Sequence, residues 1–154
     1  IYKMQVNEND PELLRLDNQL CFALYACSRE IIKAYKPILD PLGLTYTEYV
    51  VLMALWEKDK VPVKALGQKT FLDSGTLTPL LKKMAEKSLL VRERSPDDER
   101  SVIISLTQKG KSLEKKCRDN PGKLICEARL ERVDGEALMK NLHKMLENFK
   151  GKSN

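Results

Sequence analysis

The chain has 154 residues, of which 32% are charged, and a formal net charge of +5 at pH 7. This length suits a single domain, residues 1–154, with a substantial core, and the longest apolar run, residues 49–56, is far too short to cross a membrane. The N-terminal stretch has acidic residues and no apolar segment, so we expect no secretory signal and a cytoplasmic protein whose thiols are reduced.

The first predicted element is one amphipathic helix over residues 16–40, closed by Pro37 and Pro41. Its apolar face carries Leu16, Leu20, Leu24, Cys27, Ile31 and Tyr35. Thr45 and Glu48 then have the spacing of a capping box, which predicts the start of a second, buried helix that includes residues 49–58.

Two further short helices are predicted next. One covers residues 61–70, with Pro62 at its start. The other opens at Asp73 or Ser74 and runs toward residue 90, with a bend at Pro79, where a backbone hydrogen bond is missing.

The period then changes to two, which predicts strands over residues 89–94 and 101–106 around a polar turn. A helix restarts at Thr107 and is interrupted at residues 120–123. The last amphipathic helix is expected from about Val133 to Phe149.

This order, mainly α with a small β-hairpin, indicates a winged helix-turn-helix that binds double-stranded DNA. The fourth helix would enter the major groove, with small hydrogen-bonding side chains at its start and lysines placed for phosphates. The hairpin would be a wing that reaches the backbone or minor groove. Each piece alone also fits a solvated helix or a plain hairpin, but their order favours DNA binding. The residues concerned are Ser74, Thr76, Thr78, Lys82, Lys83, Arg92, Arg94 and Arg100.

Several strings resemble the MarR family of winged helix-turn-helix regulators. They are LGQKTFLDSGTLTPLLKKM and LVRERSPDDERSVIISLTQKG. Two further strings, DNQLCFALYACSREI and LTYTEY, are similar to the organic-hydroperoxide-sensing repressors of that family, and so is FLDSGTLTP, residues 71–79. The likeness runs from Leu16 to Gly110 and more loosely beyond.

The resemblance implies a homodimer that binds a pseudo-palindromic operator when reduced, without a cofactor. Residues 12–40 and 107–150 would form the dimerisation helices, and residues 45–106 the DNA-binding part. It also implies that Cys21 is the peroxide sensor, in a pocket with Tyr25, Tyr35 and Tyr46. Asp98 would orient Arg100 for the minor groove, and Ser74 and Thr76 would face bases.

The chemistry of a sensor thiol sets further expectations, because the thiolate is the form that attacks peroxide. No Lys or Arg lies one helical turn from Cys21, whereas Asp17 does and would oppose ionisation if it pointed at the sulfur. We therefore expect tyrosine hydroxyls and the start of a neighbouring helix to stabilise the thiolate. Apolar surroundings would favour organic hydroperoxides over hydrogen peroxide, and the first product would be a sulfenic acid.

The fate of the oxidised sulfur depends on a second thiol. Cys27 is a poor partner for Cys21, because six helical residues rise about 9 Å and a disulfide needs Cα atoms within about 7 Å; we expect it to pack in the core. Cys117 and Cys126 remain. The resemblance to the two-cysteine subclass favours Cys126 of the other subunit, with Cys117 as second choice. Packing of Cys126 in the dimer core, or capping of Cys21 by a small thiol, are the alternatives.

Other classes of function are weighed on the same residues. The cysteines lack C-x-x-C spacing and His143 is the only histidine, so no metal site is predicted. A thiol-dependent peroxidase would leave the DNA-reading elements unexplained, so we expect no enzyme. A MarR-type regulator released by a small lipophilic or phenolic ligand is the second alternative, and Cys21→Ser separates it from a peroxide sensor.

Overall fold

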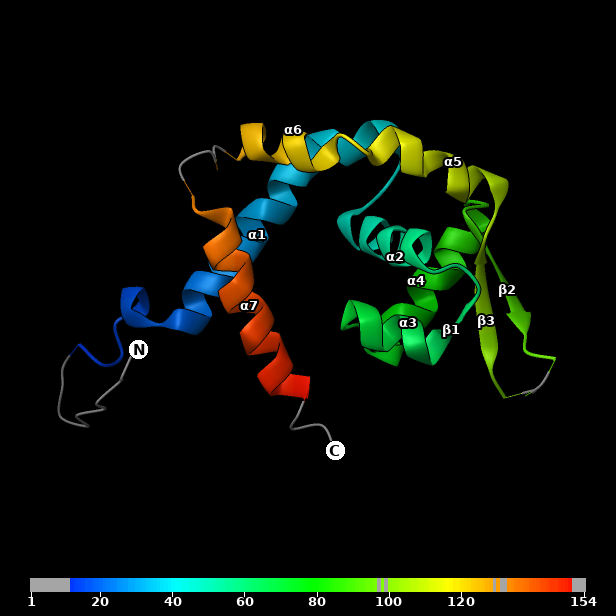
Figure 1. Ribbon diagram of the computed structural model, residues 1–154, viewed down its shortest axis with the longest axis horizontal. Coiled ribbons are helices and arrows are strands. Elements are labelled where there is room, and N and C mark those ends of the chain that lie inside the picture. The colour runs from blue at the N-terminus through cyan, green and yellow to red at the C-terminus, as the bar shows by residue number, and fades with distance from the viewer. Residues whose placement is uncertain (1–11, 97, 99, 129, 131–132, 151–154) are drawn as a thin grey trace.

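The computed structural model describes residues 12–96, 98, 100–128, 130 and 133–150, and Figure 1 shows two parts. A lobe holds α2, α3, α4 and a small sheet, and α1 and α7 overlap in this view in an arm; α5 and α6 join the two parts along the top. The helices are α1 (Leu20–Leu39), α2 (Tyr46–Glu57), α3 (Val63–Thr70), α4 (Ser74–Glu86), α5 (Gln108–Cys117), α6 (Asn120–Glu127) and α7 (Gly135–Lys150). The strands are β1 (Val61–Pro62), β2 (Leu90–Arg94) and β3 (Val102–Leu106).

The predicted capping box at the start of α2 is confirmed. The Thr45 hydroxyl accepts from the Glu48 amide at 3.3 Å, and the Glu48 carboxylate accepts from the Thr45 amide at 2.9 Å. Glu48 is only 1% exposed, and Lys87, just after α4, donates to its carboxylate at 2.8 Å. Because a buried carboxylate without a partner is strongly unfavourable, this pair ties the start of α2 to the end of α4.

A tight turn sets α4 against α3. Phe71 adopts the left-handed region, with φ of 56°, and Asp73 caps α4 by accepting from the Thr76 amide. The helix continues through Pro79 and ends at Glu86, short of residue 90, because Leu89 and Leu90 turn into the sheet. The core of the lobe is made of large apolar side chains that are almost completely buried, among them Leu52, Leu55, Leu66, Leu77, Leu81, Met84 and Ile104.

The predicted hairpin is confirmed as β2 and β3, with Leu90 opposite Leu106 and Arg94 opposite Val102. Sequence reasoning missed β1, where Val61 pairs with Ile104 to give the antiparallel order β1-β3-β2. Two residues are too few to show an alternating pattern.

The junction between the sheet and α5 depends on a small residue. Thr107 caps α5 by accepting from the Gly110 amide at 3.1 Å, and its own hydroxyl donates to the Ser88 carbonyl at 2.7 Å. A Cβ at Gly110 would lie 2.1 Å from the Leu89 carbonyl oxygen, and the Trp56 indole donates to the Gly110 carbonyl at 3.0 Å. Only glycine allows this approach of α5 to the strand.

The structure also corrects the predicted start of the first helix and the predicted break at residues 120–123, and it starts α3 at Val63 and α7 at Gly135. The first helix starts at Leu20: residues 16–18 form a short 3-10 helix, Gln19 is extended, and Pro37 lies inside α1 instead of closing it. Residues 120–123 do not interrupt a helix but open α6, because Pro121 sits in the first turn, where its missing N–H costs no hydrogen bond.

In the described part of the chain, no single helix is long and apolar enough to span a membrane. Residues 20–42 and 46–57 reach the required length and composition only when taken together, across a bend of 75°.

Candidate nucleic-acid interface and thiol site

The first turn of α4 presents hydroxyl groups to the surface. Ser74 and Thr76 are exposed and Thr78 is half-buried. Asp73 accepts from both the amide and the hydroxyl of Thr76 at 2.9 Å, and these hydrogen bonds lower the pKa of the Asp73 carboxyl. Because the Thr76 hydroxyl proton is donated to Asp73, the exposed Thr76 oxygen is left as an acceptor, the role that the amino groups of adenine or cytosine require.

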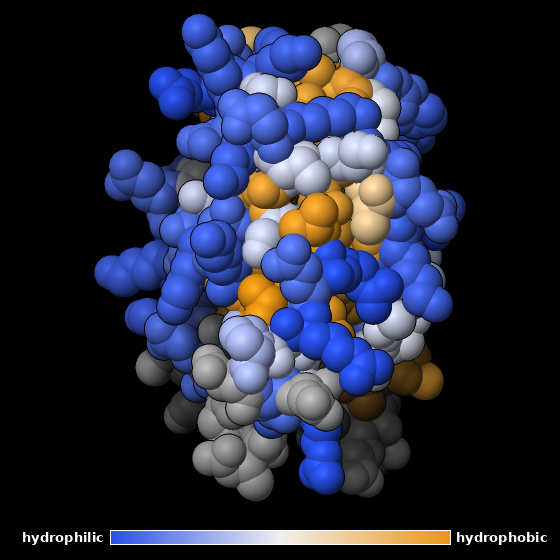
Figure 2. Space-filling view, turned by 90° about the vertical axis from the view of Figure 1, so that its right-hand side faces the viewer, coloured by the Kyte–Doolittle hydropathy of each residue, from blue (hydrophilic) through white to orange (hydrophobic). Residues whose placement is uncertain are grey.

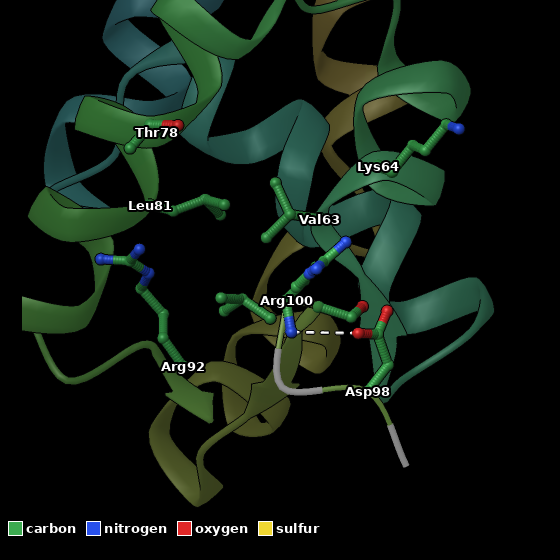
Figure 3. Close-up of a pocket in the computed structure, with 9 residues that line it drawn as sticks. Val63, Lys64, Thr78, Leu81, Arg92, Asp98 and Arg100 are labelled. Carbon is green, nitrogen blue, oxygen red and sulfur yellow. Dashed lines mark hydrogen bonds between the residues drawn. The ribbon is translucent and has the colours of Figure 1, made fainter. Parts of the chain in front are cut away.

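A hollow of about 380 Å³ lies between α3, α4 and the wing (Figure 3). It brings together four of the predicted DNA-binding residues, which come from α4, from β2 and from the turn between β2 and β3: Thr78, Arg92, Asp98 and Arg100. Lys64, in the first turn of α3, also lines the hollow, and its ammonium points away from Arg92 and Arg100 in Figure 3. Three cationic side chains, Lys64, Arg92 and Arg100, thus line this hollow. Such a group of cations suits a negatively charged phosphate backbone.

Asp98 organises the wing through the backbone. Its carboxylate accepts from the Arg100 amide at 3.0 Å, and its carbonyl accepts from the Ser101 amide at 2.9 Å. Figure 3 shows the first of these bonds. The aspartate therefore fixes the backbone from which Arg100 projects.

Lys64 is the contributor that sequence reasoning missed. The only signal was a lysine at the start of a helix, directly after Pro62 and Val63, and that pattern is common on solvated surfaces. Lys82 and Lys83 border a different hollow, of about 650 Å³, between α4 and the start of α2. Arg94 is exposed at the end of β2. The face that carries the wing is mainly hydrophilic around a hydrophobic strip (Figure 2).

Cys21 lies at the other end of the molecule, exposed in the first turn of α1. Gln19, which precedes the helix, gives no side-chain cap; its amide turns back to the Leu13 carbonyl at 2.7 Å. The partial positive charge of a helix start favours a negative group such as a thiolate. Cys21 therefore lies at the end of its own helix that carries this partial positive charge. Asp17 belongs to the preceding 3-10 helix, beyond the extended Gln19, so the expectation of a carboxylate one helical turn away is wrong.

Tyr25 follows Cys21 by one helical turn and is 56% exposed. Arg29 donates from Nη1 to the Tyr25 hydroxyl at 2.8 Å, and its guanidinium carbon lies 5.5 Å from the ring centroid. Arg29 was overlooked in the sequence because it lies two turns, not one, from the thiol.

Tyr35 and Tyr46 contact each other but lie far from Cys21. Their ring centroids are 5.1 Å apart, and burial, with smaller contributions from Tyr49 and Tyr46, raises the pKa of Tyr35 to about 12. Tyr35 is fourteen residues after Cys21 on the same helix, a rise of about 21 Å. One chain therefore does not assemble the predicted pocket.

The remaining cysteines differ from expectation in one respect. Cys27 is exposed beside a hollow that Ala128 and Leu130 also line, so its expected place in the core of the chain is wrong. Cys117 is the core thiol, 3% exposed, and burial raises its pKa. Its position at the end of α5, facing α2, could be read only from the tertiary structure.

Cys126 is exposed on α6, which packs along α1. The start of α6, at Asn120 and Lys123, lies near Ile38, and the segment just after it, at Ala128, lies near Cys27. Cys126 is thus level with the middle of α1, about 9 Å or more along the axis from Cys21. No group of three or more potential metal ligands gathers among the described residues.

Helices α2 to α4 followed by the β2–β3 wing, with cations around the hollow between them, define a winged helix-turn-helix DNA-binding protein. Residues 33–117 match the family "Transcriptional regulator SarA/Rot". The organic hydroperoxide resistance transcriptional regulator of Bacillus subtilis is 46% identical over 146 residues, which cover 95% of this chain and 99% of that protein.

Two solved structures of AbfR, a Staphylococcus epidermidis protein, are also similar. Reduced AbfR bound to DNA matches with a TM-score of 0.76 and 32% identity over 90% of this chain and 97% of that one. Disulfide-formed AbfR matches with a TM-score of 0.61 and 31% identity, covering 90% and 94%. This chain belongs to the MarR-type winged-helix transcriptional regulators, and within them to the organic hydroperoxide resistance regulators.

Proposed function

We propose that this protein is a homodimeric repressor that binds a pseudo-palindromic operator when reduced and leaves it when an organic hydroperoxide oxidises Cys21. The observation that carries the proposal is the position of Cys21. The thiol is exposed in the first turn of α1, and the other end of the same helix is buried against the lobe through Tyr35 and Leu39. A covalent change at one end can therefore move the DNA-reading elements at the other.

The relatives support this reading. The Bacillus subtilis protein is named for organic hydroperoxide resistance, and AbfR is known in a reduced, DNA-bound form and in a disulfide form. The present chain is more similar to the first of these forms than to the second. The higher TM-score against the reduced, DNA-bound form supports a conformation of this chain that is reduced and able to bind DNA.

The DNA contacts are expected from the lobe. Two copies of α4 would enter successive major grooves with half-site centres about 10 bp apart, and Ser74 and Thr76 would meet base edges. The backbone of one strand would run through the hollow beside Lys64 and Arg92, while Arg100 reaches the minor groove. Lys82 and Lys83 would meet phosphates on the other side of α4.

The arm supplies the dimer. Large apolar side chains are concentrated there on the surface of the single chain, and such a concentration marks an interaction surface. They are Leu14, Leu16, Leu20, Ile32, Val133, Leu138, Met139, Leu146 and Phe149. Tyr35 lies about 21 Å along α1 from Cys21 in one chain, and Tyr46, at the start of α2, packs against Tyr35. The sensor pocket would therefore form across the dimer, with tyrosines of the other subunit.

The redox step consumes one hydroperoxide per thiol. The Cys21 thiolate takes the terminal oxygen of the hydroperoxide, the O–O bond breaks, and the alkoxide leaves and is protonated, which gives a sulfenic acid and an alcohol. The Cys126 thiol of the other subunit then attacks that sulfur, and water leaves as the disulfide forms. We place this reaction in the cytoplasm. It acts as a stoichiometric signal and not as peroxidase turnover.

The decisive experiment is fluorescence anisotropy on a selected palindromic site. Reduced protein should bind tightly, lose binding after one equivalent of cumene hydroperoxide, and regain it with dithiothreitol. Binding that ignores peroxide would contradict the redox proposal and favour a regulator released by a ligand. No binding in any state would contradict the repressor itself.

The resolving thiol is tested separately by non-reducing electrophoresis. Cys126→Ser should leave Cys21 reactive but remove the covalent dimer, and the matched Cys117→Ser should keep it. A dimer band that persists in Cys126→Ser and disappears in Cys117→Ser would reverse the assignment.

A further inference from the structure

One pair of side chains beside Cys21 has no part in DNA contact. Arg29 holds Tyr25 twice: by the hydrogen bond of 2.8 Å to its hydroxyl, and by a guanidinium 5.5 Å from its ring centroid. An exposed arginine has many rotamers, and two contacts with one phenol select among them.

Spacing places this pair in line with the thiol. Cys21, Tyr25 and Arg29 are four residues apart in succession, so they share one face of α1. Helical side chains lean toward the N-terminus. Arg29 therefore leans over the turn of Tyr25, and Tyr25 over the turn of Cys21.

The hydrogen-bond inventory gives the arrangement a direction. A phenol has one proton to donate and can also accept, whereas a guanidinium only donates. Arg29 therefore occupies an acceptor position on the Tyr25 oxygen and leaves the hydroxyl proton for another acceptor. A charged donor also polarises the hydroxyl and makes it the stronger donor.

We infer that Arg29 is a positioning residue for the peroxide reaction: by holding the Tyr25 hydroxyl, it directs that proton to the Cys21 sulfur. The inference rests on the proposed function, because it takes Cys21 as the reacting thiol. Donation of the Tyr25 hydroxyl proton to the sulfur stabilises the Cys21 thiolate, which then takes the terminal oxygen of the hydroperoxide.

Two other carboxylates near this face, Glu12 and Glu30, pair with cations of their own segments. On α1, Glu30 lies 3.5 Å from Lys33, and before the helix Arg15 pairs with Glu12 at 2.8 Å. Asp17 is the carboxylate of the adjoining 3-10 helix. Of the described residues just after α6, Ala128 and Leu130 lie against α1 with apolar side chains. Tyr25 is the tyrosine nearest in sequence to Cys21, and Arg29 is the cation that is hydrogen-bonded to it.

The test is a double-mutant cycle on the rate of Cys21 oxidation by cumene hydroperoxide. The rate is measured as loss of free thiol across a range of pH. The protein used has Cys27, Cys117 and Cys126 replaced by serine, so that only Cys21 is counted. Arg29→Gln should lower the rate constant at neutral pH on the order of tenfold and move the midpoint of the rate–pH profile upward. Arg29→Lys, which keeps the charge but not the fork, should recover part of the loss.

Two comparisons make the cycle specific. In a Tyr25→Phe background, Arg29→Gln should have no further effect, because the inferred route runs through the hydroxyl. Lys33→Gln, an equal change of charge one turn farther along, should leave the rate unchanged. Additive effects of the two substitutions, or an equal loss in Lys33→Gln, would overturn the inference.

Failure of the inference is distinguishable from failure of the proposed function. If the unsubstituted thiol reacts and Arg29→Gln reacts equally fast, only the role of Arg29 is lost. If Cys21 does not react with hydroperoxide in any of these proteins, the proposed sensor is lost as well. Reduced Arg29→Gln should bind DNA like the parent, which checks that its fold is intact.

Discussion

The lobe and the arm both carry large apolar side chains that must be kept from water, but they do so in different ways. The lobe buries most of its large apolar side chains within one chain, with Phe71 and Val91 as exposed exceptions, and pairs its buried carboxylate, Glu48, with Lys87. The arm leaves Leu20 59% and Phe149 61% exposed. The lobe is therefore defined by contacts inside the chain and the arm by association. Cys21, the thiol proposed as the sensor, lies in the arm, where one new covalent bond can have the largest effect.

The largest expected effect breaks the link between the two parts. Cys21→Ser should abolish the peroxide response completely and leave the DNA affinity of the reduced protein unchanged, because the substitution lies in the arm. Anisotropy before and after hydroperoxide measures both, with Cys27→Ser as the matched control that still responds. A response that survives in Cys21→Ser would move the sensor elsewhere.

The next effect tests the close packing of the lobe against α5. Gly110→Ala should destabilise the fold by about 3 kcal/mol or more, because the new Cβ would lie 2.1 Å from a backbone oxygen. Urea unfolding measures the change. Gly122→Ala is the control, since nothing lies within 4 Å of a Cβ there, and equal losses in the two variants would contradict the packing argument.

A substitution in the arm should act on association instead. Leu138→Glu places a charge on the exposed apolar face of α7 and should weaken the dimer by about 2 kcal/mol, seen by sedimentation at low concentration. Binding to the full operator should fall too, because the second half-site loses its effective-concentration gain. Asn141→Glu, exposed on the same helix, adds the same charge and should change neither.

DNA contacts should show a smaller, graded effect. Arg100→Ala should weaken operator binding by about tenfold without slowing oxidation, and unchanged affinity would remove the wing from the interface. Lys64→Gln should reduce the slope of log affinity against log salt by about 1. Lys115→Gln, on α5 and outside the hollow, should not alter that slope.

The smallest effect concerns the base of the sheet. Asp59 accepts from the Leu106 amide at 2.8 Å and the Lys60 amide at 2.9 Å. Burial alone would raise its pKa, but these bonds and Lys111 hold the pKa below the ordinary 3.8. The folded pKa is the lower one, so the stabilisation is present above about pH 4 and is lost as pH falls through the folded value. Asp59→Asn should cost less than about 1 kcal/mol at pH 7, a difference in urea unfolding that shrinks toward pH 3; a constant difference would refute it.

Local patterns predicted most of the lobe. Caps at Thr45, Asp73 and Thr107 begin their helices where the side chains require, and the change to a period of two located the hairpin. The misses were β1 and α6. A two-residue strand such as β1 is stable only through its pairing with β3. A Pro-Gly sequence such as Pro121-Gly122 occurs both where a helix breaks and where one begins, so the sequence alone did not distinguish the two.

The cysteines show most clearly that periodicity alone does not predict which side chains are buried. Periodicity placed Cys27 on an apolar stripe and Cys117 on a lysine-rich helix, yet the first is exposed and the second is buried. A helix face is buried only if another element covers it, and here α2 covers Cys117, whereas nothing else in the described chain buries Cys27.

The sequence by itself determined the winged helix-turn-helix, the candidate sensor Cys21 and the polar start of the recognition helix, because caps, periods and motif strings act over a few residues. Only the tertiary structure decided that Lys64 joins Arg92 and Arg100 around one hollow, that Arg29 holds Tyr25, and that Tyr35 and Tyr46 lie far from Cys21 in the same chain. Those relations depend on the direction of α1 and the docking of α3 against the wing, which arise from burial summed over the whole core.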